Sequence, residues 1–195
     1  MLLQSISEKV TLSLIESNII DEEDKDLYQY GVLQGLRIIL NVISALIIGL
    51  LFGKVLEIIL FMTAYIPLRS YAGGFHAKTP SGCYLFSVVM LCLVSIGIRE
   101  AVLSHTVMYV MVLISVITVF ALSPVEDKNK PLDCSETKEF RKKSRIILAA
   151  EFLIFIMSGF LKWNFLFSAL AYELACMSFM ILAGLIKNKN SEKCV

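Results

Sequence analysis

The chain has 195 residues, 57% of them hydrophobic and 18% charged, with a mean hydropathy of +0.75. This is more apolar than a soluble domain, in which apolar residues including glycine make up about half of the sequence. The composition therefore predicts a polytopic membrane protein. A net charge of only +1, without a basic stripe interleaved with aromatic residues, argues against nucleic acid as a partner.

The first element, residues 1–20, is predicted to be an amphipathic helix. Leu3, Ile6, Val10 and Leu14 recur at three-to-four-residue spacing, with the charged residues largely elsewhere. Charges spread through the segment are not typical of a cleavable signal peptide. Two interpretations remain open: the helix lies along the membrane surface, or it packs against the protein's own helices.

Long apolar runs predict the rest of the fold. Because a helix crosses about 30 Å of hydrocarbon with about 20 residues, the sequence predicts an all-α integral membrane protein, a single polytopic domain over residues 1–195. The shorter spans imply either helices continued by polar flanks or a thinned bilayer. About six spans are predicted, at about 30–52, 55–68, 83–98, 101–122, 146–161 and 163–186.

Lysine and arginine in the short loops predict the orientation, because such loops are retained on the cytoplasmic side. With a cytoplasmic N-terminus, fourteen of the 18 Lys and Arg residues lie inside, seven of them between 128 and 145. Lys54, Arg99 and Lys162 lie outside, and Arg37 lies within a span. Both termini and two polar connections, 69–82 and the basic loop 123–145, are therefore predicted to face the cytoplasm.

Polar residues inside the predicted spans are further candidates for function. Gln34, Arg37 and Asn41 form one stripe on the first span, with hydrogen bonding between helices as the structural alternative. Glu57 and Glu173 are candidate inward-facing acids.

His105 and the overall cysteine pattern do not indicate a further reactive or metal-binding site. His105 is predicted near the outer end of the fourth span, on the wrong side to pair with Cys83. The five cysteines, at positions 83, 92, 134, 176 and 194, have no CxxC spacing. Neither a disulfide framework nor a metal site is indicated, and no cofactor is expected.

The stretch RSYAGGFHAKTPSGC, residues 69–83, carries the clearest chemical pattern. Thr79 is a good N-cap and Pro80 suits the first helical position, which places Cys83 in the first turn of a span. Partial positive charge at a helix start favours a thiolate, and a nearby histidine would favour it further. The pair Cys83 and His76 is therefore predicted to form a nucleophilic site where the catalytic loop 69–82 meets the start of this span.

The seven-residue gap between His76 and Cys83 constrains the backbone. On one continuous helix it would separate their Cα atoms by about 10 Å, so the chain must fold back. Pro80 with Gly82 is predicted to supply that turn. Gly73 and Gly74 are predicted to give the backbone access to positive φ just before the histidine.

The same stretch resembles the signature of the AgrB family of bacterial integral-membrane cysteine peptidases. It shares an arginine, a Gly-Gly pair two residues before a histidine, an alanine after it, and a cysteine seven residues beyond. The resemblance implies that Cys83 is the nucleophile and His76 its general base or ion-pair partner. It also implies that Arg69, Gly73 and Gly74 shape the site. The loop contains no Asp or Asn that could complete a triad, and Gln34 of the first span is a separate candidate for orienting His76.

The resemblance further implies a bacterial cell-membrane protein whose active site faces the cytoplasm and whose substrate is an AgrD-type propeptide of a quorum-sensing system. Cleavage through a Cys83 thioester would let the propeptide cyclise to a thiolactone or lactone. The lipid bilayer is a second partner, and short spans in a small bundle also admit a homodimer. The alternative is a non-enzymatic peptide transporter or export scaffold whose path is lined by Gln34, Arg37 and Asn41.

Overall fold

The structure is a computed structural model that describes residues 2–17, 19–75, 77, 79–100, 103–126 and 133–192. These residues form seven α-helices and one 3₁₀-helix, and their only β pairing is a parallel bridge between Gly73 and Val125. The predicted all-α class is confirmed. The helices are α1 (Leu2–Glu16), η1 (Glu22–Asp24), α2 (Lys25–Phe52), α3 (Val55–Ala72), α4 (Pro80–Arg99), α5 (His105–Leu122), α6 (Cys134–Phe160) and α7 (Asn164–Glu192).

Five stretches of helix are long and apolar enough to cross a membrane: Glu22–Phe52, Val55–Ala72, Pro80–Arg99, His105–Leu122 and Asn164–Asn188. They match five of the six predicted spans and support a membrane protein. The sixth prediction, 146–161, falls within α6. The last 18 residues of α6 include Lys143, Arg145 and Glu151, so this helix is less apolar than the others, and its crossing of the membrane stays a prediction.

The chain divides into two compact units, Met1–Ile47 and Ile48–Val195. In the first unit, the buried side chains of α1 are the small polar Ser7 and Thr11, whose hydroxyls donate to the carbonyl oxygens of Gln4 and Ser7. The apolar Ile6 and Val10 of α1 are exposed within this unit. An exposed apolar face is what a helix on a membrane surface requires.

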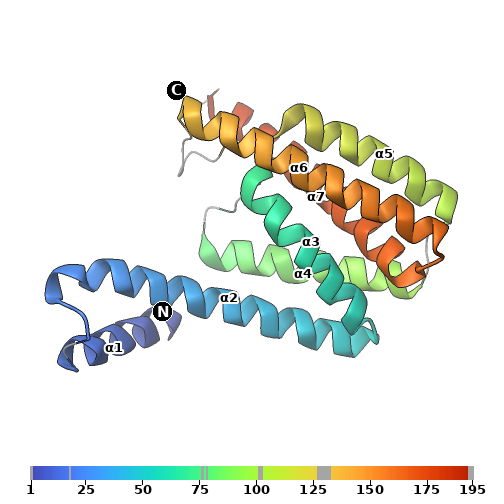
Figure 1. Ribbon diagram of the computed structural model, residues 1–195. Helices are drawn as coiled ribbons and strands as arrows, with labels where there is room; N and C mark the ends of the chain where they lie inside the picture. Colours follow the sequence, from blue (N-terminus) through green and yellow to red (C-terminus); the bar gives the residue numbers. More distant parts are fainter. Residues whose placement is uncertain are drawn as a thin grey trace. The chain divides into compact units, whose positions relative to one another are not determined.

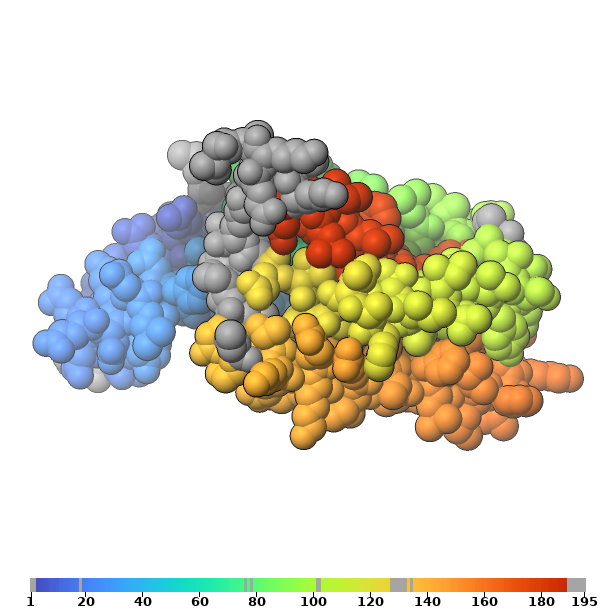
Figure 2. All heavy atoms as spheres, turned by 90° about the horizontal axis from the view of Figure 1, so that it is seen from above, coloured from blue at the N-terminus to red at the C-terminus, as the bar shows by residue number. Residues whose placement is uncertain are grey.

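The second unit is a helix bundle built around α7, which contacts α3, α4, α5 and α6 (Figure 1). In the space-filling view, α5 in yellow-green lies along α6 in orange on one face of the bundle (Figure 2). Aromatic packing joins these helices, because Phe155 of α6 stacks on Phe167 of α7 with ring centroids 4.6 Å apart, and Tyr109 of α5 packs edge-on against both. The other buried residues of this hydrophobic cluster are aliphatic side chains and methionines.

Two predicted connections are shorter in the structure than in the sequence analysis. Helix α3 continues past residue 68 to Ala72 with Pro67 inside it, and α4 already begins at Pro80. The predicted loop 69–82 therefore shrinks to 73–79. Pro67 does not end α3, because a proline within a transmembrane helix is tolerated when neighbouring groups satisfy the backbone it frees.

The second half of the predicted basic loop 123–145 is also helical, since α6 begins at Cys134. Asp133 caps this helix: its carboxylate accepts from the N–H groups of Ser135 and Glu136, and the Glu136 carboxylate accepts from the Asp133 N–H. The Ser135 hydroxyl and these backbone N–H groups hold the pKa of Asp133 below its ordinary value. The pattern Asp-x-x-Glu is a sequence signal for such a start.

Candidate functional site

The connection between α3 and α4 begins with two glycines in conformations that other residues rarely adopt. Gly73 has a φ of +70° and Gly74 a φ of +116°, as the sequence analysis predicted for both. The turn predicted at Pro80 and Gly82 is wrong, however, because both residues lie within α4. The chain leaves the helical path at Gly73 and Gly74 instead, since only glycine reaches these φ values without a steric penalty.

Arg69, in the last turn of α3, forms hydrogen bonds with the backbone of this connection. Its guanidinium donates one hydrogen bond to the carbonyl oxygen of Gly73 and another to that of Phe75. A planar guanidinium has donors in a fixed fork and can therefore hold two acceptors at once. Arg69 thus fixes the backbone on either side of Gly74, whereas its role in shaping a catalytic site stays a prediction.

Two segments distant in sequence form hydrogen bonds with the backbone of the connection. The Gly74 N–H donates to the carbonyl oxygen of Val125 at 3.1 Å, and the Val125 N–H donates to that of Ala72 at 2.9 Å. The Phe75 N–H donates to the carbonyl oxygen of Met180 on α7 at 2.8 Å. The backbone of the connection is therefore hydrogen-bonded to α7 and to the segment that follows α5.

Glycine also permits close packing between the connection and α7. A Cβ atom added to Gly184 would lie 2.7 Å from the carbonyl carbon of Gly74 and 2.8 Å from the nitrogen of Phe75. Backbone atoms cannot move aside cheaply at such distances. A residue with a side chain at position 184 would therefore displace the connection.

The Phe75 ring is packed between two helices. It contacts Phe86 of α4 with centroids 5.6 Å apart, and the Lys187 ammonium of α7 lies 5.7 Å from its centroid. A cation over an aromatic face is attracted by the ring's quadrupole. Side-chain packing thus adds to the backbone bonds in fixing the residue that precedes His76.

Helix α4 begins as the sequence predicted. Thr79 is its N-cap, with the side-chain oxygen accepting from the Gly82 N–H at 3.1 Å, and Pro80 occupies the first helical position. The Cys83 N–H donates to the Thr79 carbonyl oxygen at 3.0 Å. Cys83 is half-buried in this first turn and forms no disulfide, so its sulfur lies at the positive end of the helix dipole.

His76 and Lys78 lie outside the described residues, but both neighbours of His76 in sequence are described. Phe75 packs on Phe86, which lies one turn beyond Cys83 on the same face of α4. Ala77 packs on the first turn, because a Cβ atom added to Gly82 would lie 3.3 Å from the Ala77 Cβ. The chain on each side of position 76 therefore contacts the same two turns of α4 that contain Cys83.

The polar stripe of the first predicted span lies on α2. The Gln34 side-chain amide donates to the Tyr30 hydroxyl at 3.0 Å, and the Arg37 guanidinium donates to the Gln34 side-chain oxygen at 3.1 Å. The Asn41 amide donates to the Arg37 carbonyl oxygen at 2.9 Å. These bonds all stay within α2. Because Gln34 and Arg37 belong to the first unit, a contact between Gln34 and His76 stays a prediction.

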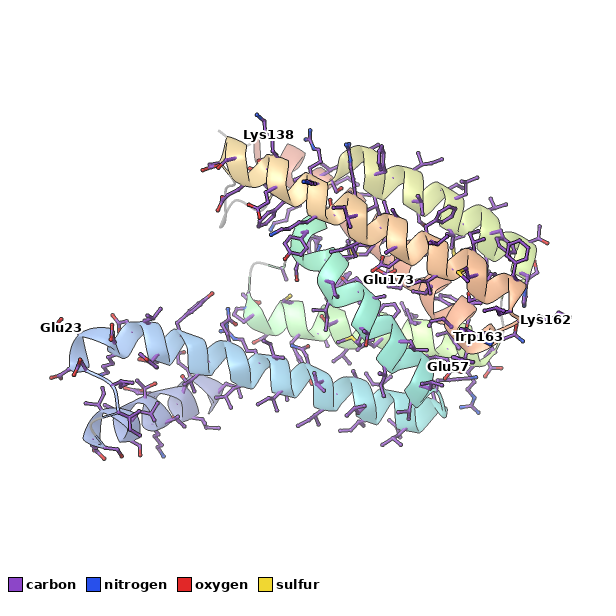
Figure 3. All side chains as sticks on the ribbon, viewed as in Figure 1. Glu23, Glu57, Lys138, Lys162, Trp163 and Glu173 are labelled. Carbon is purple, nitrogen blue, oxygen red and sulfur yellow. The ribbon has the colours of Figure 1, made fainter. Side chains whose placement is uncertain are left out.

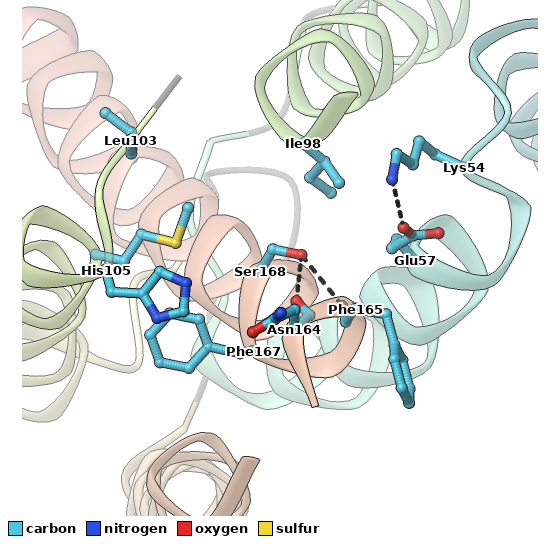
Figure 4. Close-up of a pocket in the computed structure, with 10 residues that line it drawn as sticks. Lys54, Glu57, Ile98, Leu103, His105, Asn164, Phe165, Phe167 and Ser168 are labelled. Carbon is cyan, nitrogen blue, oxygen red and sulfur yellow. Dashed lines mark hydrogen bonds and ion pairs between the residues drawn. The ribbon is translucent and has the colours of Figure 1, made fainter. Parts of the chain in front are cut away.

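A cavity of about 260 Å³ lies at the end of the bundle where α4 finishes, about 15 residues or about 22 Å along α4 from Cys83 (Figure 4). His105 lines it and stacks on Phe167 at 4.9 Å. Glu57 lines it too, with its carboxylate 2.9 Å from the Lys54 ammonium. Both residues are thus remote from Cys83, as the sequence analysis predicted for His105.

The sequence analysis missed several residues that hold the site. Val125 and Met180 act through backbone carbonyl oxygens, and any residue type can supply such a group, so no pattern could reveal them. Gly184 is one glycine among several in apolar helices. Outside this connection, the buried Glu151 of α6 was also not predicted, although a single acid within an apolar run is a recognisable signal. Among the described residues, no group of three or more His, Cys, Asp or Glu residues could hold a metal ion.

Comparison with known proteins places the chain in a family. The family model described as Accessory gene regulator B matches residues 7–186. An AgrB-like protein of Clostridium perfringens is 30% identical over 167 residues, covering 82% of this chain and 76% of its own length. The FsrB protein of Enterococcus faecalis is 29% identical over 178 residues, covering 86% and 71%.

Accessory gene regulator protein B of Staphylococcus aureus is 27% identical over 132 residues, covering 66% of this chain and 69% of its own. No solved structure matches the chain.

Proposed function

Because the chain belongs to the accessory gene regulator B family, we propose that it is a membrane cysteine endopeptidase that processes an AgrD-type propeptide. Cys83 is the nucleophile and His76 its base. The reaction takes place at the cytoplasmic edge of the bacterial cell membrane. The propeptide is cut near its C-terminal part and closes to a thiolactone or lactone signal peptide.

In the first step, the Cys83 sulfur attacks the carbonyl carbon of one propeptide bond. The tetrahedral intermediate expels the downstream segment, and the leaving nitrogen takes its proton from the His76 imidazolium. The products are a free amine and a thioester between the upstream segment and Cys83. The N-terminal turn of α4 offers partial positive charge to the sulfur during this exchange.

In the second step, a thiol or hydroxyl within the upstream segment attacks the thioester carbonyl. His76 accepts the proton of the attacking group, the Cys83 sulfur leaves as a thiolate, and the peptide is released as a ring. A thioester retains acyl-transfer potential that hydrolysis would dissipate. Exclusion of water from a site at the membrane edge therefore favours cyclisation over hydrolysis.

One observation carries this proposal: the first turns of α4 hold Cys83, and the residues on both sides of His76 pack on those same turns. Phe75 contacts Phe86, and Ala77 lies against Gly82. The hydrogen bond that Arg69 donates to the Phe75 carbonyl oxygen, and the one that the Phe75 N–H donates to the Met180 carbonyl oxygen, keep this arrangement fixed. A fixed, non-helical backbone beside a membrane helix is tolerated where protein surrounds it, and positioning a histidine beside a cysteine is a sufficient reason for it.

The proposal is tested with full-length protein in membrane vesicles, with a synthetic propeptide as substrate. Cys83→Ala and His76→Ala should each abolish formation of the cyclic product while the protein still inserts. Cys92→Ala is the matched control, because Cys92 is another half-buried cysteine on α4 and should retain full activity. Processing that survives Cys83→Ala but not Arg37→Ala would favour the transporter alternative and refute the peptidase.

A further inference from the structure

Two glutamates occupy core positions on facing helices of the bundle. Glu173 of α7 has no exposed surface, and Glu151 of α6 is 6% exposed. Each lies on the buried stripe of its helix, between hydrophobic neighbours one turn away. These neighbours are Leu148 and Phe155 for Glu151, and Leu170 and Met177 for Glu173, all fully or almost fully buried.

Neither carboxyl group is neutralised by a cation or fully satisfied by hydrogen bonds. Both side-chain oxygens of Glu173 and one of Glu151 are buried without a hydrogen-bond partner. The two groups interact electrostatically with each other, and neither forms an ion pair among the described residues. Glu57 differs in this respect, because its carboxylate is bonded to Lys54.

Two ionised carboxylates in this environment would be very costly. Removing one unpaired charge from water costs several kcal/mol even after the protein relaxes, and a second like charge nearby raises that cost further. Protonation removes the charge of a carboxyl group, and its O–H can then donate a hydrogen bond to a neighbouring carboxyl oxygen. In known proteins, carboxyl pairs in such sites share a proton.

We propose that Glu151 and Glu173 form a proton-binding site inside the helix bundle, which carries at least one proton at neutral pH. Figure 3 labels Glu173 among the helices of the bundle. Protonation keeps α6 and α7 packed together. Loss of the proton would place negative charge between them and force them apart or admit water.

Titratable groups near the site come from several helices. Tyr65 of α3 and Cys176 of α7 lie close enough to Glu173 to interact with it electrostatically. From α5, Tyr109 packs on Phe155, one turn from Glu151. Within α6, Arg145 is directed to Phe120 of α5 instead, where its guanidinium lies over the ring and donates to the backbone carbonyl oxygen.

The position of the site on α7 links it to the connection at Cys83. Met180, whose carbonyl oxygen accepts from the Phe75 N–H, lies seven residues beyond Glu173 on the same helix, or about 10 Å along its axis. A displacement of α7 at Glu173 would therefore be transmitted to the backbone beside His76. This consequence rests on the proposed function, whereas the proton-binding site does not.

Infrared spectroscopy of the full-length protein in lipid vesicles at neutral pH tests the site without relying on activity. The carbonyl stretch of a protonated, buried carboxyl group should be present, and it should disappear in the double variant Glu151→Gln/Glu173→Gln. Glutamine keeps the shape and removes the charge, so the variant should still insert. Glu57→Gln is the matched control and should leave the band unchanged. A wild-type protein without this band, or a band that survives the double variant, overturns the proposal.

Dicyclohexylcarbodiimide then assigns the proton, because this apolar reagent adds to protonated carboxyl groups and not to carboxylates. Mass spectrometry should find the adduct on Glu151 or Glu173 and none on Glu57. The modified protein should lose propeptide processing, because the added group separates α6 from α7. An adduct confined to Glu57 would contradict the site. If the band and the adduct are present but unmodified protein processes no propeptide, the proposed function fails and the proton site stands.

Discussion

The two ends of the bundle of α3 to α7 connect their helices in different ways. At the end remote from Cys83, the turn from α6 to α7 is closed by its own backbone: Trp163 N–H donates to the Ser158 carbonyl oxygen at 2.9 Å, and Lys162 N–H to that of Gly159 at 3.3 Å. At the Cys83 end, the connection from α3 to α4 is bonded to Val125 and Met180, far away in sequence.

The difference in hydrogen bonding between the two ends indicates which of them must maintain one backbone conformation. A turn closed by local hydrogen bonds needs only to reverse the chain. Long-range bonds order more of the chain and cost more conformational entropy, so they are expected where one backbone conformation must be maintained. Changes to the connection from α3 to α4 should therefore affect processing more than equivalent changes at the remote end.

The largest effect is expected from Arg69→Lys. A lysine cannot hold the carbonyl oxygens of Gly73 and Phe75 in one fixed fork, and each charge-assisted hydrogen bond is worth about 1.5–3 kcal/mol. Loss of one bond should reduce propeptide processing by about tenfold or more, since 1.36 kcal/mol is a factor of ten. The rate constant for processing in membrane vesicles is the measurement.

Arg99→Lys is the control for this prediction. Arg99 ends α4 at the remote end and pairs with Glu100 at 3.5 Å on the surface, and exposed ion pairs contribute about 0–1 kcal/mol. Its activity should remain that of the wild type. Equal losses in the two variants would mean that the fork of Arg69 does not matter.

A loss of both stability and processing is expected from Gly73→Ala. A residue other than glycine in the left-handed region costs about 1–3 kcal/mol, and the added Cβ would also collide with the Val125 carbonyl oxygen. Gly53→Ala provides the comparison, because Gly53 has a φ of +66° but no atom within 4 Å of an added Cβ. Thermal unfolding in detergent should show both variants destabilised. Only Gly73→Ala should lose processing; if Gly53→Ala loses it equally, strain alone explains the loss.

The smallest effect is expected from removing the helix cap with Thr79→Ala, which should cost about 1 kcal/mol. Ser104→Ala removes the equivalent cap of α5, whose side chain accepts from the Val107 N–H, and should cost a similar amount. Only the Thr79 variant should change the rate at which iodoacetamide alkylates Cys83, since only that cap orders the turn that holds the sulfur. An unchanged alkylation rate in Thr79→Ala would show that the cap does not order the turn that holds Cys83.

Sequence patterns predicted the local features of this site and not its long-range ones. Thr79 and Pro80 predict a helix start, and the paired glycines predict positive φ. These residue types are informative because they determine the conformation of the backbone at their own positions. The supports from Val125 and Met180 could not be predicted, since they depend on where α5 and α7 bring a carbonyl oxygen. The extension of α3 to Ala72 fits the prediction that polar flanks continue the short spans, because the helix runs on through Arg69 and Ser70.

The most direct test of the account is to capture the acyl-enzyme. The protein in vesicles is mixed with propeptide whose ring-closing thiol or hydroxyl is removed, and the reaction is stopped with acid before intact-mass and peptide analysis. The account predicts that the upstream propeptide segment is attached to Cys83 as a thioester that hydroxylamine releases, and that His76→Ala does not form it. Cleavage of the propeptide without any adduct on Cys83, or an adduct on Cys92 or Cys176, would contradict it.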